Sequence, residues 1–351
     1  MEIFMFSRSL ELIGIVSNFS SLEWYRKLSE PGTFSISFLE SDEGTLQTGT
    51  ILYNTDEPEP GIITKLTRES NGKGSELVIA KGYTLSRWLN QRIVATRELL
   101  SGTPSSIMRT LVTNNAISPS NNDRKIPNLY LGNDDSVVTD TMQYQTEYTN
   151  LAKALTDIAD SYELGYGLRF DMSEGKLYFD IWSGTDRTVT SENPCLFSPE
   201  FGSVFSQRYY EDISKYASYI ICGSGNDDDR IIQDTGGGVG LERYEIYATA
   251  SGISKKNQTE AQIKAQLRSA GAEKLAKYPK TKGFESKINI ENVTSEFFLG
   301  DYVTCENKRW GVRENMQVRA IRRNVSATRD ETTVTFGDPV PTLTSLLKAK
   351  E

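Results

Sequence analysis

Both ends of the chain consist of short segments in which apolar and polar residues alternate, with turn-forming residues between them. Across residues 34–38, phenylalanine and isoleucine alternate with serine, which is the two-residue period of a half-buried strand. Apolar segments at 62–67 and 77–80 are joined by an Asn-Gly turn, a strong hairpin signal. Several such strands with glycine-bearing turns predict a small β-barrel domain over residues 1–83.

The middle of the chain, residues 84–200, combines helix and strand patterns. A Thr-Pro pair at 103–104 supplies an N-cap and a proline at the first helical position. A second helix is expected over residues 151–162, where a capping asparagine precedes an apolar face, and a hairpin is expected over 168–182. Residues 114–148 are rich in Asn, Asp, Ser and Thr, so we expect them to be irregular.

Residues 201–340 return to strand patterns and predict a second β-barrel domain with one inserted helix at 259–278. Thr259 and Gln262 form a capping-box pair at the start of that helix. A short polar tail follows at 341–351. The sequence therefore predicts a β-rich α+β protein in which two small β-barrel domains flank a mixed α+β region.

Histidine is absent from the 351 residues, and this excludes several classes of chemistry. A chain without histidine has no Ser-His-Asp or Cys-His nucleophile system and no His-ligated catalytic zinc. The cysteines, Cys195, Cys222 and Cys305, stand far apart without a CxxC motif. We therefore expect buried, reduced thiols rather than a zinc site or a redox site.

Two loop motifs were considered as ligand sites. The glycines of residues 236–240 resemble a phosphate-binding loop, but Leu241 and Glu242 follow where a P-loop requires lysine and serine or threonine. Asp227–Asp229 lacks the alternating acids of a calcium-binding EF-hand, which leaves a solvated acidic loop or a surface cation site as alternatives. We predict no catalytic residue, no cofactor-binding residue, no metal ligand and no bound cofactor, and hence no enzyme activity.

Charge is distributed unevenly along the chain, whose formal net charge is −8. This balance argues against duplex nucleic-acid binding as the main task. Residues 28–64 contain acidic side chains and no Lys or Arg, whereas residues 308–329 are basic apart from Glu314. Either stretch can be a solvated face, or the two can form a complementary docking pair between subunits or with a neighbouring ring, in which Arg322 and Arg323 take part. The acidic residues are Glu30, Glu40, Asp42, Glu43, Asp56, Glu57 and Glu59.

The sequence predicts neither a membrane span nor a signal peptide. No stretch approaches the roughly 18 consecutive apolar residues that a spanning helix needs. An acid at Glu2 and a base at Arg8 interrupt the apolar start, unlike the basic beginning and continuous apolar core of a signal peptide. We therefore expect synthesis in the cytoplasm of the host cell.

A series of short motifs also runs through the chain in a defined order. Early strands end in GYTLSRWLNQRI at residues 82–93, and the helix at 151–162 leads into the hairpin at 167–182. LGDYVT at 299–304 then precedes a last strand that ends in glycine at 334–337. This order resembles the tail-associated (Tal-type) hub proteins of phage tail tips and baseplates, found in siphophages and prophages of Gram-positive hosts. The resemblance covers most of residues 1–340.

The resemblance implies a homotrimer in the virion tail tip that caps the tail tube. Two barrels per subunit give six positions in a ring, so a trimer can dock on the six-fold ring of a distal tail protein. The resemblance further implies contact with the tape-measure protein and with receptor-binding proteins or fibres, and DNA only in transit through the channel. Because like charges repel, an acidic lining would let DNA pass without adhesion. The chain ends at Glu351 without the long C-terminal extension of many relatives, so we expect no peptidoglycan-degrading role.

Two functions from other classes stay open on the residues alone. A cell-wall glycan hydrolase would use two carboxylates, which are defined by their distance in space rather than by their spacing in sequence. A carbohydrate-binding tail module would use exposed aromatic rings. The candidate rings are those of Trp24, Trp88, Trp182 and Trp310, of which Trp88 is expected to lie in a core.

Overall fold

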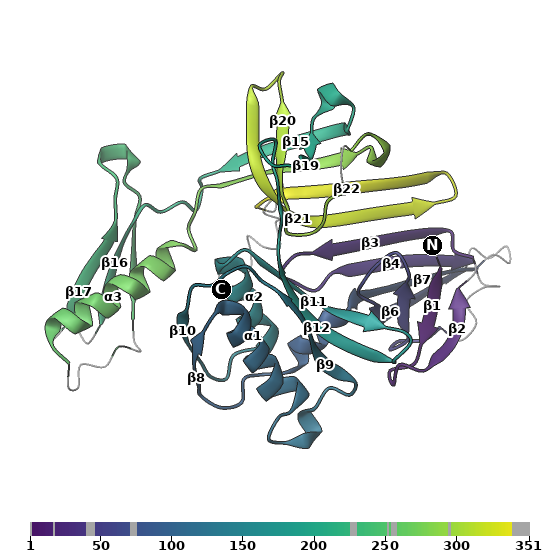
Figure 1. Ribbon diagram of the computed structural model, residues 1–351, viewed down its shortest axis with the longest axis horizontal. Coiled ribbons are helices and arrows are strands. Elements are labelled where there is room, and N and C mark those ends of the chain that lie inside the picture. Colours follow the sequence, from purple (N-terminus) through teal and green to yellow (C-terminus); the bar gives the residue numbers. More distant parts are fainter. Residues whose placement is uncertain are drawn as a thin grey trace. The chain divides into compact units, whose positions relative to one another are not determined.

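The computed structural model of the chain describes residues 2–16, 18–39, 46–70, 76–224, 230–250, 253, 258–293 and 296–338 (Figure 1). It divides into two compact units. The large unit comprises residues up to Arg208 together with those from Phe284 onward, and the small unit comprises Tyr209–Gly283. The fold is α+β and rich in strands, as predicted.

The N-terminal part of the large unit consists of antiparallel strands that follow the predicted alternation, and some of them pair with strands that are not consecutive in the chain, such as β4 with β7 and β1 with β5. Phe34, Ile36 and Phe38 are at most 2% exposed and pack in one core with Trp24, whose ring stacks on Phe34 at 5.1 Å between centroids. The hairpin predicted around the Asn-Gly turn also forms, although the turn itself lies outside the described residues. The strands are β1 (Ile3–Phe6), β2 (Leu12–Val16), β3 (Ser21–Lys27), β4 (Thr33–Leu39), β5 (Ile51–Asn54), β6 (Gly61–Ser70) and β7 (Glu76–Thr84).

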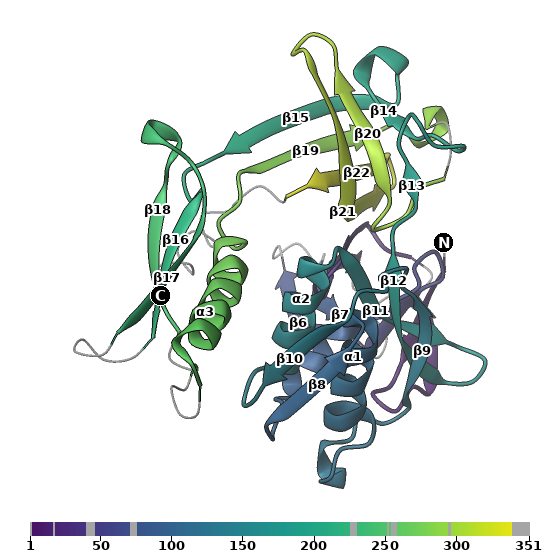
Figure 2. The ribbon, with the colours of Figure 1, turned by 60° about the vertical axis from the view of Figure 1, so that its left-hand side comes forward.

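The C-terminal part of the large unit supplies a second group of strands, most of them antiparallel (Figure 2). They are β13 (Asp186–Arg187), β14 (Leu196–Phe197), β15 (Val204–Asp212), β19 (Thr281–Ile288), β20 (Tyr302–Asn307), β21 (Val312–Ser326) and β22 (Arg329–Gly337). Strand β21 is the longest, and it pairs with β20 along its first half and with β22 along its second half.

Strands from the two ends of the chain share one sheet, in the order β15-β19-β22-β21-β3-β4-β7-β6-β5-β1-β2. The connection is the antiparallel pairing of β21 with β3, from Ala320 opposite Lys27 to Ser326 opposite Ser21. The two separate closed barrels expected from the sequence do not form among the described strands. Strand β21 pairs with the edge of β3, and β2 at the far end of the strand order pairs only with β1, so the sheet is open among the described strands.

A helical layer covers the N-terminal strands, and their apolar side chains share a core. Thr103 caps α1 by accepting a hydrogen bond from Ser106 N, and Asn150 caps α2 by accepting one from Lys153 N, so both predicted helix starts are confirmed. The prediction that residues 114–148 are irregular was wrong, because two strands form there through pairing with distant segments. The elements are a 3-10 helix η2 (Leu85–Gln91), β8 (Glu98–Gly102), α1 (Pro104–Val112), β9 (Leu129–Asp135), β10 (Met142–Thr146), α2 (Leu151–Ser161), β11 (Leu164–Asp171) and β12 (Lys176–Ser183).

The small unit is a three-stranded sheet, in the order β17-β16-β18, with one helix packed against it (Figure 2). Its elements are β16 (Tyr219–Ser224), β17 (Ile231–Gly236), β18 (Glu245–Thr249) and α3 (Glu260–Leu275). The capping box of Thr259 and Gln262 is present in both directions, as predicted. The sequence does not indicate strand β17, which falls within a predicted loop, because glycine-rich and acidic segments flank a run of only six residues.

Candidate functional site

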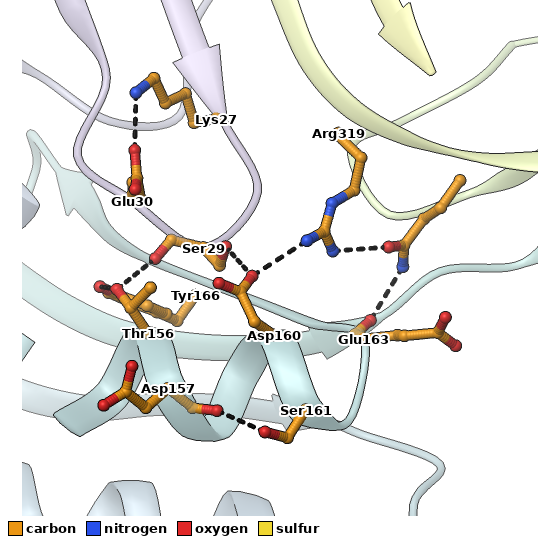
Figure 3. Close-up of polar contacts among 11 residues, drawn as sticks. Lys27, Ser29, Glu30, Thr156, Asp157, Asp160, Ser161, Glu163, Tyr166 and Arg319 are labelled. Carbon is orange, nitrogen blue, oxygen red and sulfur yellow. Dashed lines mark hydrogen bonds and ion pairs between the residues drawn. The ribbon is translucent and has the colours of Figure 1, made fainter. Parts of the chain in front are cut away.

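Three elements of the large unit meet at a polar junction formed by Ser29, Asp160 and Arg319 (Figure 3). Ser29 lies in the turn after β3, Asp160 in the last turn of α2, and Arg319 in β21. Ser29 Oγ donates to Asp160 Oδ1 at 2.6 Å, and Arg319 Nη2 donates to the same oxygen at 3.0 Å. One carboxylate oxygen therefore connects a turn, a helix and a strand.

Neighbouring hydrogen bonds reinforce the polar junction. Thr156 Oγ1 donates to the carbonyl oxygen of Ser29 at 2.7 Å, so α2 contacts this turn twice (Figure 3). Gln317 accepts from Arg319 Nη1 at 2.9 Å and donates through Nε2 to the carbonyl oxygen of Glu163 at 2.9 Å. Because each group bonds to a different element, the junction fixes the position of β21 on the helical layer.

The acidic and basic stretches noted in the sequence meet inside one chain. Arg323 lies 2.9 Å from Asp56 and 2.9 Å from Asp330. Its hydrogen bond to Asp330 makes the largest contribution to a raised pKa of its guanidinium, and the hydrogen bond to Asp56 acts in the same direction. The guanidinium of Arg322 lies over the ring of Tyr25, 4.4 Å from its centroid. Arg323 therefore forms ion pairs within the chain, and a part for it in a docking pair between subunits stays one of the two alternatives.

The LGD motif at residues 299–301 has a structural role. The carboxylate of Asp301 is 3% exposed and accepts from the backbone N–H of Thr185 at 2.8 Å and of Phe298 at 2.9 Å. Arg187 Nε adds a third bond at 2.7 Å. Gly300 adopts a φ of +99°, a conformation that suits glycine, and this turn brings Asp301 to its donors. The motif therefore anchors the loop before β20.

Besides β2, which pairs only with β1, segments of β15 and β6 have a neighbouring strand on one side alone in the described parts of the chain. At one end, β15 pairs only with β19, and its Phe205 side chain is 72% exposed. Strand β5 pairs with β6 only at Gly61 and Ile62. From Thr64 to Thr67, β6 therefore has a neighbouring strand, β7, on one side only. We call these segments the β15 edge and the β6 edge.

A cavity of about 360 Å³ lies on the outer face of β11 and β12, and we call it the β12 pocket. Side chains on the inner face of these strands, such as Phe179, are buried in the core, whereas alternate residues face outward. Asp180 points outward and is held by Arg169 Nε at 2.7 Å and by Asn133 N at 2.8 Å. The residues that define the pocket are Glu59, Tyr166, Gly167, Arg169, Asp180 and Trp182.

Glu59 has the most perturbed carboxyl group among the residues that line this pocket. Burial raises its pKa to about 7, although hydrogen bonds from Ser86 oppose the shift. Ser86 N donates to Glu59 Oε1 at 2.5 Å. The segment that carries Glu59 was singled out in the sequence for its charge alone, and its position beside β11 depends on tertiary contacts that no local pattern indicates.

The remaining residues singled out in the sequence occupy structural positions. Cys195, Cys222 and Cys305 are buried and lie outside any disulfide, and burial raises the pKa of Cys305. Trp24 is buried, Trp88 packs against the core as expected, and Trp310 is 49% exposed. Asp227–Asp229, Glu40, Asp42 and Glu43 lie outside the described residues, and residues 236–240 connect β17 with β18.

Two further observations concern only the described parts of the chain. None of their helices combines the length and the apolar character that a bilayer span requires. No three Cys, Asp or Glu side chains in these parts gather closely enough to hold a metal ion.

Comparisons with known proteins give one family. The family described as Siphovirus ReqiPepy6 Gp37-like protein has a model that matches residues 1–338. No curated protein matches the sequence.

Solved structures of low sequence identity share the fold. The 43 kDa tail protein of prophage MuSo2 from Shewanella oneidensis is 10% identical, with a TM-score of 0.62 over 96% of this chain and 98% of that one. The tail protein from Neisseria meningitidis MC58 is 11% identical, with a TM-score of 0.60 over 96% of both chains. Prophage tail protein gp18 from Listeria monocytogenes is 11% identical, with a TM-score of 0.59 over 100% of this chain and 99% of that one.

Proposed function

Because the chain belongs to the Siphovirus ReqiPepy6 Gp37-like family and is a phage or prophage tail protein, we propose that it is the homotrimeric hub of the tail tip or baseplate. In this role it caps the tail tube and adapts the six-fold symmetry of a distal tail ring to three-fold symmetry. It opens for passage of the tape-measure protein and DNA. It is a structural component of the virion and not an enzyme.

The observation that carries this proposal is that the large sheet joins two halves, which come from opposite ends of the chain. Strands β15, β19, β20, β21 and β22 belong to one half and strands β1 to β7 to the other, joined where β21 pairs with β3. In the proposal these halves belong to the predicted domains 201–340 and 1–83. Three subunits then contribute six halves, which matches a six-fold partner ring.

The β15 edge and the β6 edge support the assembly of subunits into a closed ring. An edge strand offers unpaired backbone groups, and these readily pair with another chain. If the β15 edge of one subunit meets the β6 edge of the next, the contact is head-to-tail and repeats until the rotation closes. The exposed ring of Phe205 on β15 then becomes buried in each contact.

The net charge of −8 supports a passage role rather than a nucleic-acid binding role. DNA in transit is repelled by a surface of like charge and does not adhere to it. The proposed partners are the distal tail ring, the tape-measure protein and receptor-binding proteins or fibres. Opening is proposed to occur by rigid-body rearrangement of subunits after contacts elsewhere in the tip, following synthesis in the host cytoplasm and assembly into the tail.

Electron microscopy tests this role directly. Antibody raised against the chain and conjugated to gold should label one end of the tail, distal to the capsid, and class averages of the isolated assembly should show three-fold symmetry. Label along the tail tube or on the capsid would contradict the tail-tip assignment. Two-fold or six-fold averages would contradict the trimer.

A further inference from the structure

The β12 pocket plays no part in the hub proposal, and its floor has an uncommon construction. Two glycines of β11, Gly165 and Gly167, lie beside the indole ring of Trp182. A Cβ atom at position 165 would lie 2.3 Å from Trp182 Cε2, and one at position 167 would lie 3.6 Å from Cη2. The ring therefore lies along the backbone of β11, in a position that a side chain at 165 would exclude.

The orientation of this indole ring is fixed by a hydrogen bond. Trp182 Nε1 donates to the carbonyl oxygen of Leu299 at 2.8 Å. The polar edge of the ring is thus satisfied by the protein, and the ring itself lines the cavity. An indole held in this way offers a flat apolar surface whose negative π face attracts weakly positive C–H groups.

The basic side chains that line the cavity are each paired with an acidic side chain. Arg169 Nε lies 2.7 Å from Asp180, Arg26 lies 3.2 Å from Glu57, and Lys27 lies 2.6 Å from Glu30. An anionic ligand would have to compete with the acidic partners in these ion pairs. A neutral ligand with many hydroxyl groups can instead bond to their outer oxygen and nitrogen atoms without separating them.

Glu59 supplies a further polar group at the floor of the cavity. Its Oε1 accepts from Ser86 N, and its Oε2 lies 3.5 Å from the place that a Cβ at Gly167 would take. The carboxyl group therefore reaches the same glycine surface as the indole ring. One flat apolar face and several planar polar groups converge on a cavity of about 360 Å³.

We propose that the β12 pocket binds a neutral saccharide of one or two rings, with one sugar ring packed on Trp182 and its hydroxyl groups bonded to Glu59 and to the Arg169–Asp180 pair. The C–H groups on one face of a pyranose ring match the indole, and the hydroxyl groups on its edge match paired carboxylates and guanidinium groups. This activity is binding without cleavage. It is independent of the hub role, since it requires only the large unit.

Saturation-transfer NMR on the full-length chain tests this proposal, because the method detects weak binding. The probes are glucose, galactose, N-acetylglucosamine, maltose, lactose and chitobiose. At least one should receive saturation from the protein, and its Kd should rise at least ten-fold in Trp182→Ala. Trp310→Ala is the matched control, because Trp310 is 49% exposed and does not line the pocket, and it should leave the Kd unchanged.

Gly167→Ala is a second variant that tests the pocket independently of the folding of Trp182→Ala. A Cβ at this position meets its neighbours at 3.5 Å or more, which is ordinary contact, so the variant should fold while the methyl group narrows the cavity. We expect a Kd at least ten-fold higher. The proposal is overturned if none of the six sugars receives saturation, if Gly167→Ala and Trp182→Ala bind as the parent does, or if the protein hydrolyses the disaccharides. The mass of the assembly should be the same in all variants, which separates this test from that of the hub.

Discussion

Arg319 and Asp160 are separated by 159 residues in the sequence, yet Arg319 Nη2 lies 3.0 Å from Asp160 Oδ1. The same oxygen accepts from Ser29 Oγ at 2.6 Å. A C-terminal strand, a central helix and an N-terminal turn thus depend on one carboxylate. This contact joins segments from three distant parts of the chain within the large unit. Asp160 is therefore the residue whose replacement should weaken the junction most.

Removal of the Asp160 carboxylate should destabilise the large unit. Asp160→Ala leaves Ser29 and Arg319 without their shared acceptor, and we expect a loss of about 1–2 kcal/mol in the free energy of unfolding. Asp157→Ala is the matched control on the same helix, because its partner Lys153 lies 3.1 Å away in an exposed pair worth about 0.3–0.5 kcal/mol. Urea unfolding measures both, and equal effects of the two variants would contradict the role of the junction.

Replacement of the Asp301 carboxylate should lower the free energy of unfolding more than replacement of the Asp160 carboxylate. Its two oxygens accept from Thr185 N, Phe298 N and Arg187 Nε, whereas an asparagine has only one acceptor oxygen. Asp301→Asn therefore turns an NH₂ group toward a donor and should cost about 3 kcal/mol. On the neighbouring strand β13, Asp186→Asn keeps an acceptor oxygen for Thr188 N and should change stability by less than about 0.5 kcal/mol. Thermal unfolding of the pair checks this, and similar melting temperatures would refute it.

Features encoded by neighbouring residues were predictable from the sequence. Thr103, Asn150 and Thr259 each cap the helix that their local pattern indicates, because a cap involves residues only three positions apart. Alternation placed β4 correctly, since every second side chain meets the same core. These signals need no knowledge of the remaining chain.

Features created by distant pairing were not predictable. Strand β9 lies in a polar region and forms because it pairs in parallel with β12, far along the chain. The pairing of β21 with β3 replaces the expected closed barrels, and no turn or period in either segment indicates it. The β12 pocket combines Glu59 with Trp182 for the same reason. The division into 1–83, 84–200, 201–340 and 341–351 stays a prediction.

The carboxyl group of Glu59 should make stability depend on pH. Its native pKa of about 7 lies above the ordinary value of 4.5, so between these pH values the native state binds more protons than the unfolded state. Stability should therefore fall as pH rises from about 5 to 8. Glu59→Gln keeps an acceptor for Ser86 N and removes the charge, so at pH 8 it should be more stable than the parent by about 1–3 kcal/mol.

Denaturant unfolding at pH 5 and pH 8 measures this difference. The exposed residue Glu11 provides the control, and Glu11→Gln should follow the parent at both pH values. If Glu59→Gln has the same pH dependence as the parent, the carboxyl group is not the one that titrates in this window.

The β15 edge should be sensitive to charge if it forms a subunit contact. Phe205 is 72% exposed in the single chain, so Phe205→Glu should not disturb the fold, but it would place a charge in the proposed interface. We expect the variant to be monomeric at concentrations where the parent is assembled. Leu241→Glu, at a position 95% exposed in the small unit, should assemble normally. Size-exclusion chromatography compares them, and assembly of Phe205→Glu would exclude this edge from the interface.

The mass of the purified chain in solution tests the trimeric hub most directly. Light scattering over a range of concentrations should give three times 39.3 kDa, about 118 kDa, either for the chain alone or on addition of the distal tail protein of the same phage, after subtraction of the ring's own mass. A chain that stays at 39.3 kDa at every concentration and fails to assemble on that ring would contradict the hub.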